Sequence, residues 1–487
     1  MRRNPLLAVI AAAALAGCVS LAPGYQRPAA ELPAVWRDAP ANGMSASRDQ
    51  WWTLFGDPVL DRLVAEALAH NQDLALAAAR VDEARALLQV ADAEQVPAID
   101  ASAQRDRTRL FSERSSTPFP LPPGTRFINN NNRATLNVSY ELDLWGRLRN
   151  ASDAARAELL ASRAARDTVR ITLAAQVAQS YFQLTALDAQ AEATRRSLEF
   201  RMRDLELQKV RNASGLIGDF DLRQREAEVA SARAQLPELE RLRATEELAL
   251  AVLLGRSPRD IIEGGIQREA DRGEPPIAVV PEGLPSELLL RRPDLVEAEQ
   301  RLIAANARIG VARASLFPRI SLTGYLGSES GALSDLFTGP AGVWQLAAAL
   351  SQPIFQGGRL FGEIDATRAR ERQAVARYRK AIQEAFKEVR QALVAQARSR
   401  EVFDAEADRI KALNETLRLA RIRYDLGISS QLELLDAERG LLQAEINRVE
   451  ALRAQRNAVT DLVRALGGGW DGLPQDAGGP VAQAAPR

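Results

Sequence analysis

Apolar side chains recur with a helical period through two long stretches of the chain. The clearest run steps by three and four residues, as in a coiled-coil seam: Ile410, Leu413, Leu417, Ala420 and Tyr424. The pattern predicts one helix from about Leu360 to Leu426 and an equivalent one from about Arg147 to Ser214, both free of proline. At about 1.5 Å per residue, each helix would be about 100 Å long.

A glycine-containing turn and a shorter return helix follow each long helix. The return helices are expected at Phe220–Leu254 and Gln431–Leu466, where the apolar period continues. Each is about half as long as its partner. We therefore expect another helix to stack on its end, and the segments of about 25 to 40 residues that end at Pro97 and at Pro318 have the missing length.

Four short segments alternate in polarity and predict strands rather than helices. They run from Ile99 to about Thr108, from Arg133 to Leu144, from Arg319 to about Gly327 and from Val343 to Phe355. Each has about 10 residues, the length of a tilted membrane-spanning β-strand. An amphipathic hairpin in a water-soluble domain is the alternative for each pair.

The two halves of the chain follow one plan. Gly146-Arg147-Leu148 recurs 212 positions later as Gly358-Arg359-Leu360. Earlier in each half the offset is 221, as between Pro97 and Pro318. The first half is therefore longer between its strands, in the stretch from Ser112 to Asn132 that is rich in proline and asparagine. Extra length in such a segment predicts a longer loop.

Four strands cannot close on themselves, and open strand edges cannot lie in lipid. Several copies must therefore contribute, and three would supply twelve strands. The expected fold class is mainly α with a pair of β-hairpins and an internal two-fold repeat. A homotrimer would form a long coiled-coil α-barrel and a 12-stranded β-barrel with four strands from each chain.

The N-terminus has the features of a lipoprotein signal. Two arginines precede the apolar run Leu6–Gly17, which is too short to span a bilayer and ends in Leu15-Ala16-Gly17-Cys18. A small residue before cysteine is what a lipoprotein signal peptidase requires, so Cys18 is the expected lipidation site, carrying diacylglycerol and an N-acyl chain. An aspartate directly after the cysteine usually retains a bacterial lipoprotein in the inner membrane. Position 19 carries valine instead, which favours the outer membrane. A chance cysteine after an ordinary signal peptide is the alternative.

Composition and charge narrow the function classes further. The chain has 63 basic and 63 acidic residues, which argues against a nucleic-acid binder. Hydrophobic residues make up 46% and aromatic ones 5%, a balance typical of long packed helices. One histidine and one acylated cysteine predict no metal site, and no nucleotide-binding or nucleophile motif is present. We therefore expect no cofactor beyond the lipid on Cys18 and no enzymatic activity.

Four signature stretches together resemble the outer membrane factor (TolC-like) family, and within it the OprM/NodT-type efflux lipoprotein branch. They are Trp51-Trp52-Thr53-Leu54-Phe55-Gly56-Asp57-Pro58, Arg291–Leu295, Leu316–Thr323 and Gln352–Arg359. The resemblance covers about residues 20 to 468. It implies a homotrimeric, palmitate-bearing outer-membrane duct of a multidrug-resistance efflux system, with a periplasmic membrane-fusion adaptor and an inner-membrane transporter of the RND type as partners. A periplasmic coiled-coil lipoprotein tether without a pore is the alternative, and the four strands distinguish the two.

The resemblance also implies where such a duct closes and docks. The adaptor-docking tips fall on the helix-to-helix turns: Gly215, Leu216, Ile217, Gly427, Ile428 and Ser429. The periplasmic gate or constriction falls beside them: Asp221, Tyr424, Leu432, Glu433 and Asp436. Ser429 stands where the family has an arginine that helps to hold the tip shut. Arg211 and Arg423 flank the turns and are the arginines that could take over this role. Plain turn glycines and a solvated helix face are the alternatives.

The chain divides into segments on this basis. We expect a signal peptide (1–17), an acylated extension (18–56), a first repeat (57–254, hairpin about 99–144), an equatorial linker (255–285), a second repeat (286–466, hairpin about 319–355) and a C-terminal tail (467–487).

Overall fold

The computed structural model describes residues 20–33, 50–109, 128–268, 291–468 and 470. Contacts divide the chain into two compact units. The first, here called the sheet unit, comprises Met1–Pro28, Asp82–Ala161 and Glu299–Arg377. The second, the coiled-coil unit, comprises Ala29–Val81, Ser162–Ala298 and Tyr378–Arg487. Cys18 and the signal segment lie outside the described residues.

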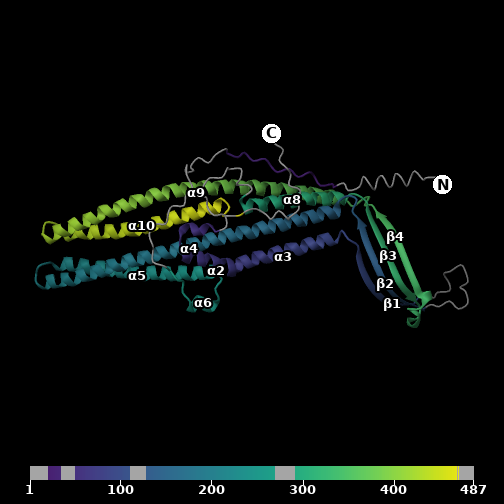
Figure 1. The fold of residues 1–487 in the computed structure, drawn as a ribbon, viewed down its shortest axis with the longest axis horizontal. Coiled ribbons are helices and arrows are strands. Elements are labelled where there is room, and N and C mark those ends of the chain that lie inside the picture. Colours follow the sequence, from purple (N-terminus) through teal and green to yellow (C-terminus); the bar gives the residue numbers. More distant parts are fainter. Residues whose placement is uncertain (1–19, 34–49, 110–127, 269–290, 469, 471–487) are drawn as a thin grey trace. The chain divides into compact units, whose positions relative to one another are not determined.

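The helices of the two halves match in length. The long helices α4 (Arg147–Ala213) and α9 (Arg359–Asp425) have 67 residues each, and the return helices α5 (Asp219–Leu253) and α10 (Gln431–Ala465) have 35 each (Figure 1). The helix directly before each first strand, α3 (Gln72–Ala93) or α8 (Pro293–Ala314), has 22. The predicted internal repeat is confirmed. Among the described residues, no helix has the length and apolar character needed to cross a membrane.

The helix before the first strand is interrupted, which the sequence pattern did not predict. α2 (Pro58–His70) ends one residue before α3 begins, with Asn71 in an extended conformation between them. The Asn71 side chain accepts hydrogen bonds from the amides of Asp73 and Leu74, at 2.9 and 3.0 Å. It thereby caps the new helix, as a short polar side chain commonly does.

The expected stacking on the ends of the return helices is present in both halves. The side-chain amide of Asn71 donates to the carbonyl of Leu253, the last residue of α5, at 2.9 Å. In the second half Arg292, directly before α8, donates to the carbonyl of Ala465, the last residue of α10, at 3.0 Å. Each of these contacts, here called a helix joint, thus connects the end of a return helix to the start of the helix that stacks on it.

The four strands form one antiparallel sheet in chain order. They are β1 (Ala98–Arg109), β2 (Ile128–Leu142), β3 (Arg319–Ser330) and β4 (Gly342–Ser351), so the two hairpins pair through β2 and β3. β2 begins five residues earlier than predicted, because Ile128 pairs with Arg109. β4 ends at Ser351 instead of Phe355, since Pro353 has no amide hydrogen for a ladder.

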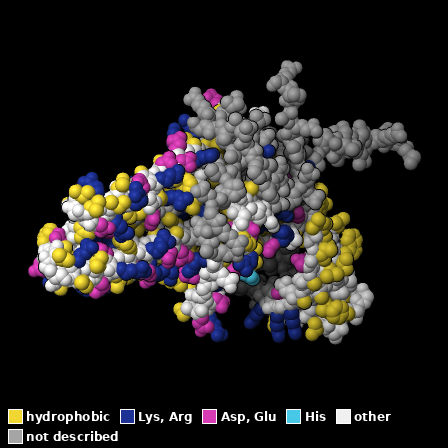
Figure 2. Space-filling model, turned by 60° about the vertical axis from the view of Figure 1, so that its left-hand side comes forward, with side chains coloured by type: hydrophobic (Ala, Val, Ile, Leu, Met, Phe, Trp, Pro, Cys, Tyr) yellow, Lys and Arg dark blue, Asp and Glu magenta, His cyan; other side chains and the backbone are white. Residues whose placement is uncertain are grey.

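The two faces of this sheet differ in chemistry. Paired residues lie on the same face, and one face carries Ile99, Val138, Leu326, Leu346 and Trp344 in neighbouring rows. Trp344 and Leu346 are each 79% exposed within the single chain. On the other face Ser102 is hydrogen-bonded to Thr135 and Asn137. The sheet is therefore amphipathic, and yellow side chains cover much of it in Figure 2.

Candidate functional site

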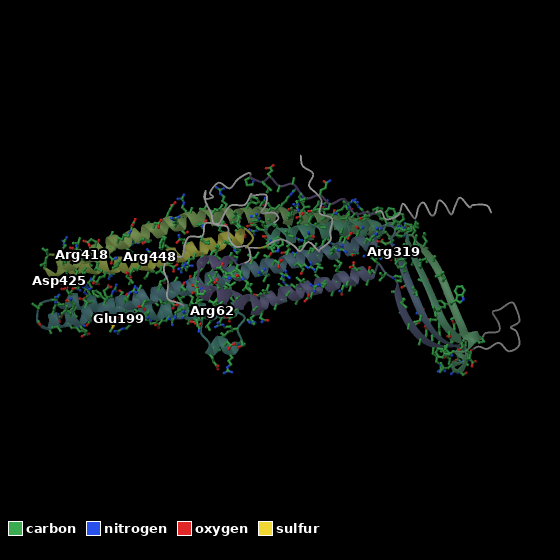
Figure 3. The ribbon with its side chains drawn as sticks, viewed as in Figure 1. Arg62, Glu199, Arg319, Arg418, Asp425 and Arg448 are labelled. Carbon is green, nitrogen blue, oxygen red and sulfur yellow. The ribbon has the colours of Figure 1, made fainter. Side chains whose placement is uncertain are left out.

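Two equivalent turns close the coiled-coil hairpins. After α4, Gly215 has φ +71° and the Leu216 amide donates to the Arg211 carbonyl at 2.9 Å. After α9, whose last residue Asp425 is labelled in Figure 3, Gly427 has φ +70° and the Ile428 amide donates to the Arg423 carbonyl at 3.0 Å. This bond from beyond the helix end, next to a left-handed glycine, is a Schellman motif.

Large apolar side chains at these turns are exposed in the single chain. Leu216 is 74% exposed and Phe220 79% in the first turn region, and Leu426 and Ile428 are 70% and 66% exposed in the second. Water-exposed apolar groups clustered at a helix-hairpin end are costly unless another surface covers them. Of the predicted docking residues, Leu216 and Ile428 therefore present the most apolar area.

The first two turns of α10 have two distinct faces. Leu432, Glu433 and Asp436 are exposed. Leu434 and Ala437 are buried with Ala420 of α9, and Leu417 and Tyr424 pack against them. The seam read from the sequence is thus the packed side, and the three predicted constriction residues share the free side of the helix.

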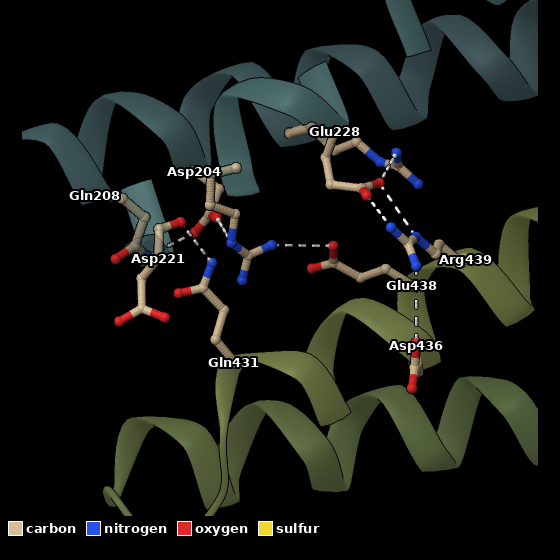
Figure 4. A network of polar contacts seen from close by, with 10 residues as sticks. Asp204, Gln208, Asp221, Glu228, Gln431, Asp436, Glu438 and Arg439 are labelled. Atoms are coloured by element: carbon tan, nitrogen blue, oxygen red, sulfur yellow. Dashed lines mark hydrogen bonds and ion pairs between the residues drawn. The ribbon is translucent and has the colours of Figure 1, made fainter. Parts of the chain in front are cut away.

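The predicted gate pair is not joined within one chain. The Asp221 carbonyl accepts a hydrogen bond from the Gln431 side chain at 3.2 Å (Figure 4). Among the described residues, no hydrogen bond connects Asp221 with Tyr424, and the Ser429 hydroxyl has no partner. Arg423, one of the two suggested replacements for the missing arginine, lies 3.7 Å from Glu433, so it pairs with a predicted constriction residue.

A buried arginine connects three helices close to the two turns. Arg225 of α5 is 3% exposed. Its Nε lies 3.3 Å from the Asp204 carboxylate in α4, and its Nη1 lies 3.5 Å from the Glu438 carboxylate in α10. The Gln208 side chain, 1% exposed, belongs to the same network (Figure 4). Arg225 therefore joins the two coiled-coil hairpins by charge where the seam would otherwise be apolar.

Glu228 forms a second ionic link one turn further along α5. Arg201 of α4 donates to it at 3.0 Å, and Arg439 of α10 also pairs with it. The hydrogen bond from Arg439 holds the pKa of the Glu228 carboxyl below its ordinary value. Burial acts in the opposite sense on Glu438 and raises the pKa of that carboxyl despite the nearby Arg225.

These two shifts affect the pH dependence of stability on opposite sides of the ordinary glutamate pKa. The contribution of Glu228 is present above its unfolded-state pKa and is lost as pH falls through its lowered folded-state pKa. The contribution of Glu438 is present below its unfolded-state pKa and is lost as pH rises through its raised folded-state pKa. The link between the hairpins therefore contains one carboxyl whose contribution to stability is lost as the pH falls and one whose contribution is lost as the pH rises.

The sequence contains a signal for this network. Arg201 and Gln208 occupy the same helical stripe of α4 as buried Leu205, and Gln431 and Glu438 are buried beside Leu434 in α10. Polar residues at seam positions indicate buried pairing. At the repeat offset of 212, Glu438 corresponds to Glu226, which is paired with Arg223 on the exposed side of α5.

Comparisons with known proteins point to one class of protein. A family model described as "Outer membrane efflux protein" matches residues 63–256 and 284–468. The "Probable efflux pump outer membrane protein TtgC" of Pseudomonas putida is 37% identical over 478 residues, 96% of each chain.

Solved structures agree with this match. A membrane protein from Pseudomonas aeruginosa has 36% identity and a TM-score of 0.85, with 94% of this chain and 99% of that chain covered. The CmeC outer membrane channel of Campylobacter jejuni has 27% identity and a TM-score of 0.86, with 93% and 95% covered.

Proposed function

The chain belongs to the outer membrane efflux protein family, and we propose that it is a passive exit duct in the outer membrane, through which substrates handed over from an energised pump leave the cell. The similarity to an efflux pump outer membrane protein over 96% of both chains supports this role. The protein would supply a path and a gate, with no chemistry of its own.

The observation that carries the proposal is the amphipathic sheet with two free edges. Within the described residues, β1 and β4 each have one neighbouring strand. An open edge in lipid leaves backbone groups without hydrogen-bond partners, so the sheet must continue into other copies of the chain. Three copies would close a 12-stranded barrel with the apolar face toward lipid and the polar face toward the lumen.

The helical hairpins would continue the duct across the periplasm. α4 and α9 have no interruption over 67 residues, and their apolar turns would dock a periplasmic membrane-fusion adaptor. An RND-type transporter in the inner membrane would then complete the pump. The helices of three copies supply the columns of an α-barrel around the same axis.

The gate would lie at the start of α10. Leu432, Glu433 and Asp436 would face the axis, and three-fold symmetry would repeat each residue around it. Carboxylate rings of this kind favour cations. Asp221 and Tyr424 of neighbouring hairpins would close the gate, with the Arg423–Glu433 pair serving in place of the arginine that Ser429 replaces.

We further propose that Cys18 carries the diacylglycerol and N-acyl chains that the lipoprotein signal Leu15-Ala16-Gly17-Cys18 predicts. Each buried CH₂ contributes about 0.8 kcal/mol, so two or three chains anchor a protein firmly.

The proposal is tested by fractionation and conductance together. The expected product is an oligomer in outer-membrane fractions that dissociates only on heating, and that adds ion conductance to a planar bilayer. A monomer released from membranes by mild salt would contradict the duct. A membrane-bound protein that assembles and adds no conductance, even with its adaptor and transporter present, would favour the tether instead.

A further inference from the structure

Three arginines of β1 share the apolar face of the sheet. Residues of a strand alternate between faces, so Arg105, Arg107 and Arg109 lie on the same side as Ile99 and Ala101. All three are exposed. Within the described part of the chain none of them forms an ion pair. Figure 2 shows dark-blue side chains grouped beside the yellow ones of the sheet.

The register places these arginines at the border of the apolar band. The band runs in β2 from Leu142 to Ala134, which pairs with Ala103. At about 3.4 Å per residue and a tilt of about 40°, these residues cover about 20 Å of the membrane normal, close to the height of a lipid-facing band. Arg105 pairs with Asn132 in the next row, so the guanidinium groups begin where the band ends.

Among the described residues of the four strands, none on this face is acidic. The paired β2 residues are Asn132, Asn130 and Ile128. The nearest carboxylate of the strand, Asp106, alternates to the opposite face, where Gln104 donates to it at 3.0 Å. A charged side chain is costly in the middle of a lipid-facing surface and is tolerated at its border. The position therefore calls for an anionic group at membrane-surface depth.

We propose that Arg105, Arg107 and Arg109 bind the phosphate groups of a phosphorylated lipid in the outer leaflet. The inference rests on the proposed function, which puts the apolar face in lipid. Guanidinium groups bind phosphate through two parallel hydrogen bonds. The three residues lie toward the end of β1 where Arg109 pairs with Ile128. The opposite strand ends continue into α3 and α4, so the arginines face the leaflet opposite to the helices.

Continuity with the apolar band selects a lipid over a soluble anion. The acyl chains of the lipid would lie against Ala101 and Ala103 directly below its headgroup. Free phosphate would gain nothing from that band.

The test uses the purified full-length oligomer in mixed micelles. The temperature of heat-induced dissociation is measured as diphosphoryl lipid A is added. The same measurement is made with dephosphorylated lipid A and with inorganic phosphate. A ligand that binds the native oligomer alone raises the dissociation temperature. We expect the increase with diphosphoryl lipid A only. Equal increases with both lipids, or an increase with inorganic phosphate, would overturn the proposal without any variant.

Variants locate the effect. Arg105→Gln, Arg107→Gln and Arg109→Gln combined should weaken the apparent affinity for the phosphorylated lipid about tenfold or more. Arg241→Gln, Arg398→Gln and Arg418→Gln combined remove three arginines that are 58% to 71% exposed on helices, and should leave it unchanged. An unchanged affinity in the first triple variant would overturn the proposal.

Failure of this inference is separable from failure of the duct. Conductance and outer-membrane fractionation of the first triple variant are measured in parallel. A variant that conducts normally and still binds the lipid would contradict the lipid site and leave the duct proposal intact. Absence of the wild-type chain from the outer membrane would remove the proposed function and the lipid site together.

Discussion

At the residue scale, the chain uses charge where a coiled coil would ordinarily use apolar packing. Arg225 and Glu228 of α5 contact acidic and basic partners in α4 and α10. Buried pairs of this kind contribute modest net stability, but removing one partner leaves a charge that is costly. These links are therefore expected to control which arrangement of the two hairpins is stable.

Glu228→Gln should weaken the connection between the hairpins. The variant loses charge-assisted hydrogen bonds from Arg201 and Arg439, which predicts a loss of about 1–3 kcal/mol at neutral pH. The difference from wild type should shrink as the pH is lowered through the folded-state pKa of Glu228. Thermal unfolding as a function of pH measures both effects. A constant difference down to acidic pH would rule out the ionic account.

Asp221→Ala combined with Tyr424→Phe should raise ion conductance, because it removes the polar groups proposed to close the gate. Asp408→Ala is the control, since Asp408 is 78% exposed on α9 and pairs, within the described residues, with its neighbour Lys411 alone. Conductance through the reconstituted protein is the measurement. An unchanged value in the double variant would remove both residues from the gate.

Residue-scale prediction from the sequence succeeded where local geometry decides. Gly215 and Gly427 follow helix patterns and lie in the left-handed region, as turn glycines should. The Arg225 network was not predicted, because its members come from three helices and become neighbours only after folding. The gate assignment of Asp221, Tyr424, Leu432, Glu433 and Asp436 stays a prediction.

At the element scale, glycine is required for different reasons in the turns and at the helix joints. Added Cβ atoms would meet nothing within 4 Å at Gly427 or Gly218. Gly427 has a positive φ, whereas Gly218 has φ −79°. Only backbone conformation distinguishes the two sites.

Gly427→Ala should therefore lower the free energy of unfolding by about 1–2 kcal/mol. Gly218→Ser should have little effect, since Ser430 occupies the equivalent position in the second repeat and serine is a good N-cap. Denaturant unfolding of the two variants provides the comparison. Equal stabilities would contradict the strained-turn account.

Gly467→Ala should be more damaging than Gly427→Ala. Gly467 has φ +103°, and an added Cβ would lie 2.1 Å from the Arg291 carbonyl oxygen at the joint between columns. Steric overlap then adds to strain, and the same geometry recurs at Gly255 with His70. Melting temperatures of the two alanine variants rank the effects. A milder loss at Gly467 would show that the joint relaxes easily.

The ends of the long helices were predictable from the apolar period, and those of α4 and α9 differ from expectation by at most one residue. The end of β4 was predicted too late, at Phe355 instead of Ser351, although Pro353 marks it. The break at Asn71 was missed, because the apolar period continues across it and the Asn71–Leu253 contact joins residues far apart in sequence.

At the whole-molecule scale, the sheet supplies the reason for assembly. Its exposed apolar face and its two single-neighbour edges are unfavourable in an isolated chain. Closure among copies removes the edges, and lipid covers the face. The stability of the protein should therefore be inseparable from its oligomeric state.

The most direct test of this claim is disulfide cross-linking between β1 and β4. Ser102→Cys is combined in turn with cysteine at Val343, Gln345, Ala347 or Ala349, which lie on the same face of the sheet. In one chain the two edges are separated by two strands, about 14 Å, too far for a disulfide. We predict that one combination cross-links neighbouring chains in the outer membrane and yields a covalent ladder that stops at three copies. Ladders that continue beyond three, or no cross-link from any combination, would contradict the closed trimer.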